Sequence, residues 1–200
     1  MSVMTEVVAQ ITTSLDGYVA GPDDGPGRGL GTGGERLHYW VFGGPWSYDE
    51  EPTGEATGTD KEMLDEGMAK LGAVIGGRAT YDAAAAWGGS NPWGLPFFIL
   101  THRPPDEASE GFTFVDGLEE ALAQAKEAAG KKQVGIMGGA DVIRQALKGG
   151  HLDELVISIA PVILGAGKRL FEGLDQVIVL ENVSAIQSRW ATHVRYRVVS

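Results

Sequence analysis

Apolar runs and amphipathic repeats alternate along most of this chain. Apolar, β-branched or aromatic runs predict strands at residues 6–13, 73–75, 96–101, 112–115, 134–137 and 155–161. Apolar positions at helical spacing predict helices at residues 35–42, 60–71, 80–86, 118–129 and 140–147. Glycine-rich polar stretches at residues 21–34 and 43–59 predict long loops, which are often functional or mobile.

Two further strands are expected at residues 177–181 and 192–199. In the last one, apolar residues alternate with His193, Arg195 and Arg197, which is typical of a strand with one face in solvent. Strands alternating with helices, followed by strands alone, predict an α/β fold whose sheet is mostly parallel with antiparallel C-terminal strands. Since no linker interrupts the pattern, residues 1–200 are expected to form a single domain.

Composition narrows the function classes. Hydrophobic residues make up 43% of the chain and there is no cysteine, so disulfides and thiolate chemistry are excluded. The formal net charge of −11 argues against non-specific binding to nucleic acid, which needs cations to neutralise phosphates. The N-terminus lacks a signal-peptide pattern, and no apolar run approaches the roughly 20 residues of a membrane helix. We therefore expect a soluble cytoplasmic protein.

The segment from Val134 to Ile143 is the most informative motif. An apolar run ends in Gly138-Gly139, and a helical pattern starts at Ala140. A strand, a tight turn and a helix N-terminus in this order can bind an anion, because glycine lets backbone N–H groups approach a phosphate. The alternative is a simple strand-to-helix turn, since the full glycine fingerprint of a Rossmann fold is absent.

Two other strand ends carry cations and hydroxyls. Gly77-Arg78-Ala79-Thr80 offers a guanidinium, which binds phosphates through its planar fork. Thr101-His102-Arg103 offers a second cation beside a hydroxyl. If both segments contact one nucleotide, the added positive charge favours a ribose 2′-phosphate and hence NADPH. The alternatives are a plain helix cap at Thr80 and solvated surface side chains at Arg78 and His102.

Few residues in the sequence are candidate proton donors. The turn at Asp16-Gly17 either borders a bound ligand or is only a turn. Glu35 and His38 are spaced to project together from a helix, and either could supply a proton, unless this is an ordinary surface helix. Glu35 and Asp16 are our candidate catalytic residues. Asp60 and the acidic residues after it are expected on a solvated helix face, and no spacing indicates a metal site.

The ordered set of motifs resembles the dihydrofolate reductase-like superfamily. Within it, the chain is most similar to the reductase domain of bifunctional riboflavin-biosynthesis deaminase-reductases and its stand-alone bacterial relatives. The motifs that carry this resemblance are Thr13-Ser14-Leu15-Asp16-Gly17-Tyr18, Ile75-Gly76-Gly77-Arg78-Ala79-Thr80, Leu100-Thr101-His102-Arg103-Pro104, Ile136-Met137-Gly138-Gly139-Ala140 and Pro161-Val162-Ile163-Leu164-Gly165.

The resemblance implies a three-layer α/β/α domain that binds NADPH across the strand ends, and a homodimer formed through the edge of the C-terminal strands. It implies cofactor contacts by Ala9, Gly17, Gly77, Arg78, Thr80, Thr101, His102, Arg103, Gly138, Gly139, Ala140 and Val142. Among these, Gly77, Arg78 and Thr80 would contact the phosphates. Ala9 and the Asp16-Gly17 turn would border the nicotinamide.

Departures from the pattern bear on the substrate. Glu35 is only a loose positional substitute for the acidic residue of true dihydrofolate reductases, and residues 90–96 lack the arginine with which those enzymes hold folate. We therefore expect an NADPH-dependent reductase of a small heterocyclic or carbonyl substrate, pterin-like or pyrimidine-like, other than folate. The alternative is a non-catalytic nucleotide-binding or interaction module that retains the reductase fold.

Overall fold

A single sheet forms the centre of the computed structural model, which describes residues 5–50, 52–107 and 109–199. Its strands are β1 (Val7–Ser14), β3 (Leu71–Gly77), β4 (Phe97–Leu100), β5 (Phe112–Val115), β6 (Gln133–Met137), β7 (Glu154–Ala160), β9 (Val179–Gln187) and β10 (Thr192–Val199). These eight strands lie in the order β5-β4-β3-β6-β1-β7-β10-β9. Neighbours from β5 to β7 pair in parallel, whereas β10 is antiparallel to both β7 and β9. The predicted fold class is confirmed.

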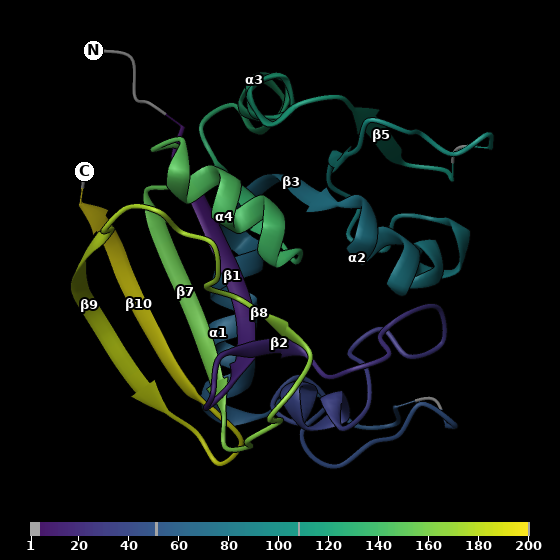
Figure 1. Cartoon of the computed structure of the whole chain (residues 1–200), viewed down its shortest axis with the longest axis vertical. Coiled ribbons are helices and arrows are strands. Elements are labelled where there is room, and N and C mark those ends of the chain that lie inside the picture. The colour runs from purple at the N-terminus through teal and green to yellow at the C-terminus, as the bar shows by residue number, and fades with distance from the viewer. Residues whose placement is uncertain (1–4, 51, 108, 200) are drawn as a thin grey trace.

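Helices cover both faces of the sheet (Figure 1). They are α1 (Gly58–Lys70), α2 (Arg78–Ala83), α3 (Leu118–Ala129) and α4 (Ala140–Lys148). Leu122 of α3 and Ile143 of α4 pack on Ile75 and Ile136 in one large hydrophobic cluster. Tyr81 of α2 packs on Val74, which points to the opposite face from Ile75 because side chains alternate along a strand. The result is a three-layer α/β/α arrangement.

The irregular elements depart most from the sequence pattern. The aromatic segment predicted as a helix at 35–42 forms only a short 3-10 helix, η1 (Gly34–His38). The helix predicted to reach residue 86 ends at Ala83, because Ala85, Ala86 and Trp87 take left-handed φ values of 48°, 51° and 49° in η2 (Ala85–Gly89). This reversal turns Trp87 onto Phe112, against which its ring stacks at 5.7 Å between centroids.

A second, two-stranded sheet pairs β2 (Tyr18–Ala20) with β8 (Lys168–Arg169). Neither strand was expected from the sequence. Within the part of the chain that the structure describes, no helix is long and apolar enough to cross a membrane. Residues 1–4, where the signal-peptide pattern was judged missing, lie outside the described residues.

A polar row crosses the sheet on the face that α1 covers. Thr12, Ser158 and His193 are register partners on the adjacent strands β1, β7 and β10, and all three are buried. His193 Nε2 lies 2.7 Å from Asp60 Oδ1, and its Nδ1 lies 2.8 Å from Ser158 Oγ. The expectation that Asp60 lies on a solvated helix face is wrong, because Asp60 is only 4% exposed. The polar face predicted for the last strand is likewise not in solvent at His193.

We expect His193→Leu to destabilise the protein by about 3 kcal/mol, because it leaves the buried Asp60 carboxylate without its partner. Replacing both partners, in Asp60→Leu/His193→Leu, should recover most of that loss, since a well-packed apolar pair costs little. Urea unfolding of the three proteins measures both effects. A loss below about 1 kcal/mol in the single variant, or an additive loss in the double variant, would contradict the buried pair.

Candidate nucleotide and substrate site

Four adjacent parallel strands end at one edge of the sheet. β4, β3, β6 and β1 are neighbours, so the turns that follow Leu100, Gly77, Met137 and Ser14 lie along the same edge. In open α/β sheets, ligands bind outside this edge. The structure therefore gathers the four segments in which the sequence placed candidate site residues.

The turn between β6 and α4 forms a glycine cradle, which we define as Gly138 and Gly139. Both residues have left-handed φ values, 73° and 84°. A Cβ at Gly138 would lie 2.9 Å from Thr80 Cγ2, and one at Gly139 would lie 3.4 Å from Thr80 Oγ1. Only glycine fits such an approach at this backbone conformation. The cradle opens directly onto the first turn of α4, whose N–H groups have no partner inside the helix.

The remaining cofactor candidates near the cradle are packing residues. A Cβ at Gly77 would lie 3.1 Å from Val142 Cγ2, so β3 and α4 touch here without room for a side chain. Ala140 and Val142 are buried, and Ala9 has no exposed surface in the same hydrophobic cluster. The Ala9 side chain packs in this cluster, and the expectation that Ala9 borders the nicotinamide stays a prediction. These residues shape the cradle from beneath.

Arg78 and Arg103 lie together at the ends of β3 and β4. The Arg78 Nη1 group donates to the carbonyl oxygen of Arg103, and Nε donates to Asp82 Oδ1 at 2.8 Å. Thr101 Oγ1 accepts from the Arg103 N–H at 3.1 Å, which closes a tight turn. Two arginines and a hydroxyl-bearing residue thus come together at the ends of β3 and β4, and their contact with a nucleotide stays a prediction.

His102 lies at the outer side of this cluster. Its ring contacts the carboxylate of Asp116, and the two side chains are 84% and 73% exposed. A pair so exposed contributes little to stability. The His102 side chain therefore lies at the solvent-exposed rim of the site, and its contact with Asp116 does not hold it in one position.

Asp16 joins two loops at the end of β1. Its carboxylate accepts from Ser14 Oγ at 2.6 Å, from the Leu164 N–H at 3.1 Å and from the Gly165 N–H at 2.8 Å. These hydrogen bonds, that of Ser14 first, lower the pKa of Asp16 from 3.8 to about 2. Gly17 follows with a φ of 84°, and its carbonyl accepts from the Leu170 N–H at 2.9 Å. The arrangement makes Asp16 a clamp between the β1 turn and the loop after β7.

Glu35 and His38 occupy η1, which contacts β1, β2 and β7. The Glu35 carbonyl accepts from Trp46 Nε1 at 2.9 Å, and burial followed by the charge of Glu35 raises the pKa of Tyr48 to about 12. Burial also lowers the pKa of His38 to about 4, so its imidazole is neutral at pH 7.

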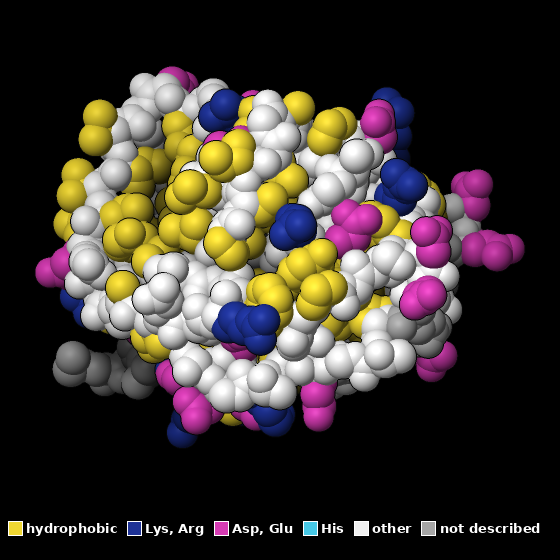
Figure 2. Space-filling model, turned by 90° about the horizontal axis from the view of Figure 1, so that it is seen from below, with side chains coloured by type: hydrophobic (Ala, Val, Ile, Leu, Met, Phe, Trp, Pro, Cys, Tyr) yellow, Lys and Arg dark blue, Asp and Glu magenta, His cyan; other side chains and the backbone are white. Residues whose placement is uncertain are grey.

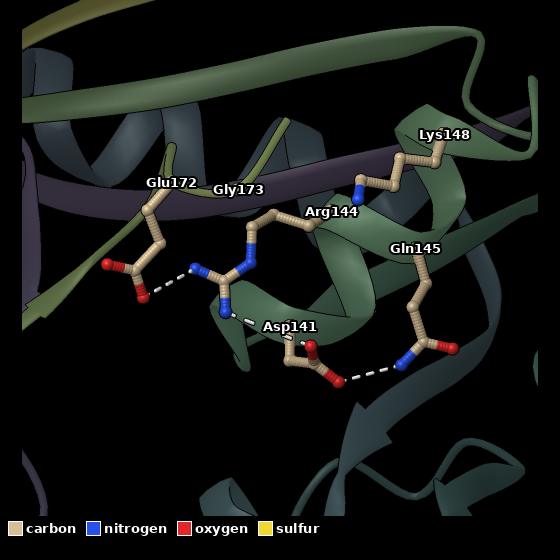
Figure 3. A pocket seen from close by; sticks show the side chains of 6 residues that line it. All are labelled: Asp141, Arg144, Gln145, Lys148, Glu172 and Gly173. Carbon is tan, nitrogen blue, oxygen red and sulfur yellow. Dashed lines mark hydrogen bonds and ion pairs between the residues drawn. The ribbon is translucent and has the colours of Figure 1, made fainter. Parts of the chain in front are cut away.

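A surface hollow of about 320 Å³ lies along the outer face of α4 (Figure 3). Its central side chain, Arg144, points to Glu172 at 3.1 Å and to Asp141 at 3.8 Å. Arg144 also donates to the carbonyl of Arg169 at 3.2 Å. The hollow ties α4 to the segment after β8, and its cation is already paired. It is a structural contact that keeps α4, and with it the cradle, in place.

Sequence reasoning missed the polar row and its covering residues. Asp60 looked like one acid among several on a helix, and His193 looked like one of three outward polar residues. The sequence held two weak signals. His193 is the only one of those three residues that is not an arginine, and Trp40 lies in a segment rich in aromatic residues. Among the described residues, no group of three His, Asp or Glu side chains is arranged to hold a metal ion.

Solved structures with this fold include proteins of flavin and folate metabolism. A putative riboflavin biosynthesis protein from Shewanella aligns over 98% of this chain and 100% of its own, with a TM-score of 0.69 and 23% identity. Dihydrofolate reductase from Enterococcus faecalis, complexed with NADP(H), aligns over 98% of each chain with a TM-score of 0.63 and 16% identity. Acinetobacter baumannii RibD aligns over all of this chain, which spans 59% of that protein, with a TM-score of 0.64 and 17% identity.

Sequence comparisons agree with the fold. The uncharacterized protein YwjB of Bacillus subtilis is 29% identical over 125 residues, which cover 62% of this chain and 71% of that protein. The model of the RibD C-terminal domain matches residues 5–192. This match takes in the strand ends, the glycine cradle and η1, and it confirms the suspected superfamily. The chain belongs to the RibD C-terminal domain family.

Proposed function

We propose that this protein is an NADPH-dependent reductase that transfers a hydride to a small heterocyclic or carbonyl substrate. The glycine cradle carries the proposal. Both of its glycines have left-handed φ values, and a Cβ at Gly138 would come too close to Thr80. The cradle leads directly into the N-terminus of α4. A pyrophosphate suits a site where it can come close to the backbone N–H groups at a helix N-terminus.

The neighbouring cations indicate which nucleotide fits. Arg78 and Arg103 lie together at the ends of β3 and β4, the strands next to β6, and their guanidinium groups are the ones that would bind a ribose 2′-phosphate. Thr80 and Thr101 add hydroxyls, and the exposed His102 would lie at the adenosine side. NADPH, when bound, would supply hydride chemistry. The residues of this chain would bind the phosphates and orient the nicotinamide toward the Gly17 turn.

A reductase of this kind also needs a proton. With a pKa of about 2, Asp16 is ionised at neutral pH and is a poor acid, so we assign it a positioning role in place of the catalytic one. Glu35, or a water bound beside it, is the proposed proton source. Glu35 lies on η1, which contacts both β1 and β7.

We also propose that the protein forms a homodimer through β9. This nine-residue strand is one edge of the sheet, and Glu181 is its single charged residue, with no Lys, Arg or Pro to protect the edge further. Val179, Val183 and Ile186 on it are 57%, 45% and 46% exposed. Figure 2 shows apolar side chains gathered on the side of the molecule where Figure 1 places β9 and β10. A second copy paired antiparallel at β9 would cover them.

The cofactor proposal predicts that Arg78→Ala weakens NADPH binding about tenfold or more, because a charge-assisted contact to a phosphate is lost. Binding of NADH should change less than about threefold. Titration with each nucleotide, followed by tryptophan quenching, measures both constants. Lys131→Ala, in the exposed turn before β6 and so at the opposite end of that strand from the cradle, is the matched control. Equal losses for the two nucleotides would remove the 2′-phosphate assignment, and no binding of either nucleotide to the unaltered protein would end the reductase proposal.

The clamp at Asp16 predicts a pH-dependent loss of stability. A folded-state pKa of about 2, below the ordinary 3.8, contributes stability that is present above pH 4 and is lost as the pH falls toward 2. Asp16→Asn should therefore melt at a lower temperature than the unaltered protein at pH 7, and the difference should shrink between pH 4 and pH 2. Thermal unfolding across this range tests it, with the exposed Asp106→Asn as control. A difference that stays constant with pH would show that the Asp16 charge is irrelevant.

The dimer proposal predicts that Val183→Lys yields a monomer. The charge would fall at the middle of β9, where two copies would otherwise bring apolar side chains together. Sedimentation velocity distinguishes the two states directly. Glu127→Lys, on the exposed face of α3, makes a larger charge change and should leave the dimer intact. An unaltered protein that sediments as a monomer at all concentrations would refute the proposal.

A further inference from the structure

The Arg78 guanidinium is held in one orientation by three contacts. Its Nε donates to Asp82 Oδ1 at 2.8 Å, and its Nη1 donates to the carbonyl oxygen of Arg103. Its Cζ atom lies 6.0 Å from the centroid of the Tyr81 ring. A guanidinium has more N–H donors than these two hydrogen bonds use. The contacts therefore fix the orientation of the group and leave donors for an anion.

Tyr81 lies under this guanidinium and is itself fixed. It follows Arg78 by three residues in α2, a spacing that brings two side chains together on one helix face. Its ring packs edge-on against Phe112 and Phe114, with 5.3 Å between centroids in each pair. Its hydroxyl oxygen lies 2.7 Å from Ser109 Oγ, and the residue is only 6% exposed. The position of Arg78 therefore depends on how α2 packs against β5 and the segment before it.

The turn that follows α2 is strained. Ala85, Ala86 and Trp87 have φ values of 48°, 51° and 49°, a region that residues other than glycine rarely adopt. The four alanines at 83–86 favour a continued right-handed helix, so the local sequence opposes the observed conformation. Backbone strain of this kind persists only where the surrounding structure imposes it, and it is concentrated near ligand sites.

Aromatic contacts of Trp87 impose the strained turn. Its ring stacks on Phe112 with 5.7 Å between centroids and 18° between planes. It also contacts Trp93, Phe97 and Tyr81, with 5.0, 5.4 and 6.5 Å between centroids. The left-handed backbone is what turns Trp87 back onto these rings. The turn thus places a second aromatic side chain against Tyr81 from the end of α2.

We propose that Tyr81 and Trp87 are positioning residues that set the preference of this protein for a nucleotide with a ribose 2′-phosphate. Tyr81 supports the Arg78 guanidinium, and Trp87 holds Tyr81 against β5. Neither side chain is assigned a contact with the nucleotide. This inference rests on the proposed cofactor function, and it adds the groups that hold the phosphate-binding cation in place.

Removing the ring under Arg78 should lower the selectivity for NADPH. We expect Tyr81→Leu to reduce the ratio of NADPH affinity to NADH affinity about fivefold, because a cation–π contact of this kind is lost. Tyr81→Phe keeps the ring and loses only the hydroxyl, so its ratio should stay within about twofold of the unaltered protein. Titration followed by nicotinamide fluorescence measures both affinities without depending on the tryptophans.

A second pair of variants separates positioning from general stability. Trp87→Leu should reduce the ratio about threefold or more. Trp93→Leu removes another tryptophan of the same cluster, which contacts Trp87 and Phe97 but, among the described residues, makes no ring contact with Tyr81. It should lower the thermal unfolding midpoint as much as Trp87→Leu does and keep the ratio within about twofold. Thermal unfolding shows that each variant is folded at the temperature of the titration, and Trp87→Leu decides the matter if Tyr81→Leu does not fold.

The outcomes separate this inference from the reductase proposal. An unchanged ratio in folded Tyr81→Leu or Trp87→Leu would overturn the inference, and so would an equal loss in Tyr81→Phe or Trp93→Leu. In those cases an NADPH preference in the unaltered protein leaves the cofactor site standing. Equal affinity of the unaltered protein for the two nucleotides would overturn the inference together with the 2′-phosphate assignment. Binding of neither nucleotide to the unaltered protein refutes the proposed function itself.

Discussion

The close approach of two strand-to-helix turns sets the geometry of the site. The turn after β6 reaches the turn after β3 at a distance that leaves no room for a Cβ at Gly138, where the nearest Thr80 atom would lie at 2.9 Å. Gly77 repeats the constraint from the other side, against Val142. Both turns thus approach each other through glycine. A Cβ at either position would press on a side chain of the facing element and disturb the packing of α4 on β3.

Charge acts locally in this arrangement. The chain carries a net charge of −11, yet Arg78 and Arg103 meet at one strand end through a side-chain to backbone hydrogen bond. At physiological ionic strength, charges separated by more than about 8 Å are largely screened from each other. A small anion would therefore respond mainly to the charges nearest to it, and the acidic surface would matter mainly to large polyanions. This is why the composition argues against nucleic acid without arguing against a nucleotide.

Local patterns were predictable from the sequence, and long-range pairs were not. The helix at 118–129 has the predicted bounds, because its apolar stripe repeats within one segment. Strand β9 extends six residues beyond the predicted end at 181, because its pairing with β10 supplies hydrogen bonds that its own sequence does not reveal. Asp60 is buried by a histidine that lies 133 positions later, a partner that no periodicity can indicate. The cradle could be predicted for the same reason as the helix at 118–129, because its strand, glycines and helix are contiguous in the sequence. Its use as a cofactor site remains a proposal.

The two sides of the candidate site are therefore built by different means. The nucleotide side depends on short contiguous motifs, each at the end of a regular strand, and such motifs tolerate few changes because backbone atoms form the cradle. The polar row and Trp40, by contrast, depend on side chains from five separate segments, joined by the hydrogen bonds of Trp40 to Thr12 and of His193 to Asp60 and Ser158. Side chains can change one at a time without moving the backbone beneath them. A fold divided in this way can keep one cofactor while its substrate pocket changes, and fold similarity at 16 to 23% identity therefore carries no information about the substrate.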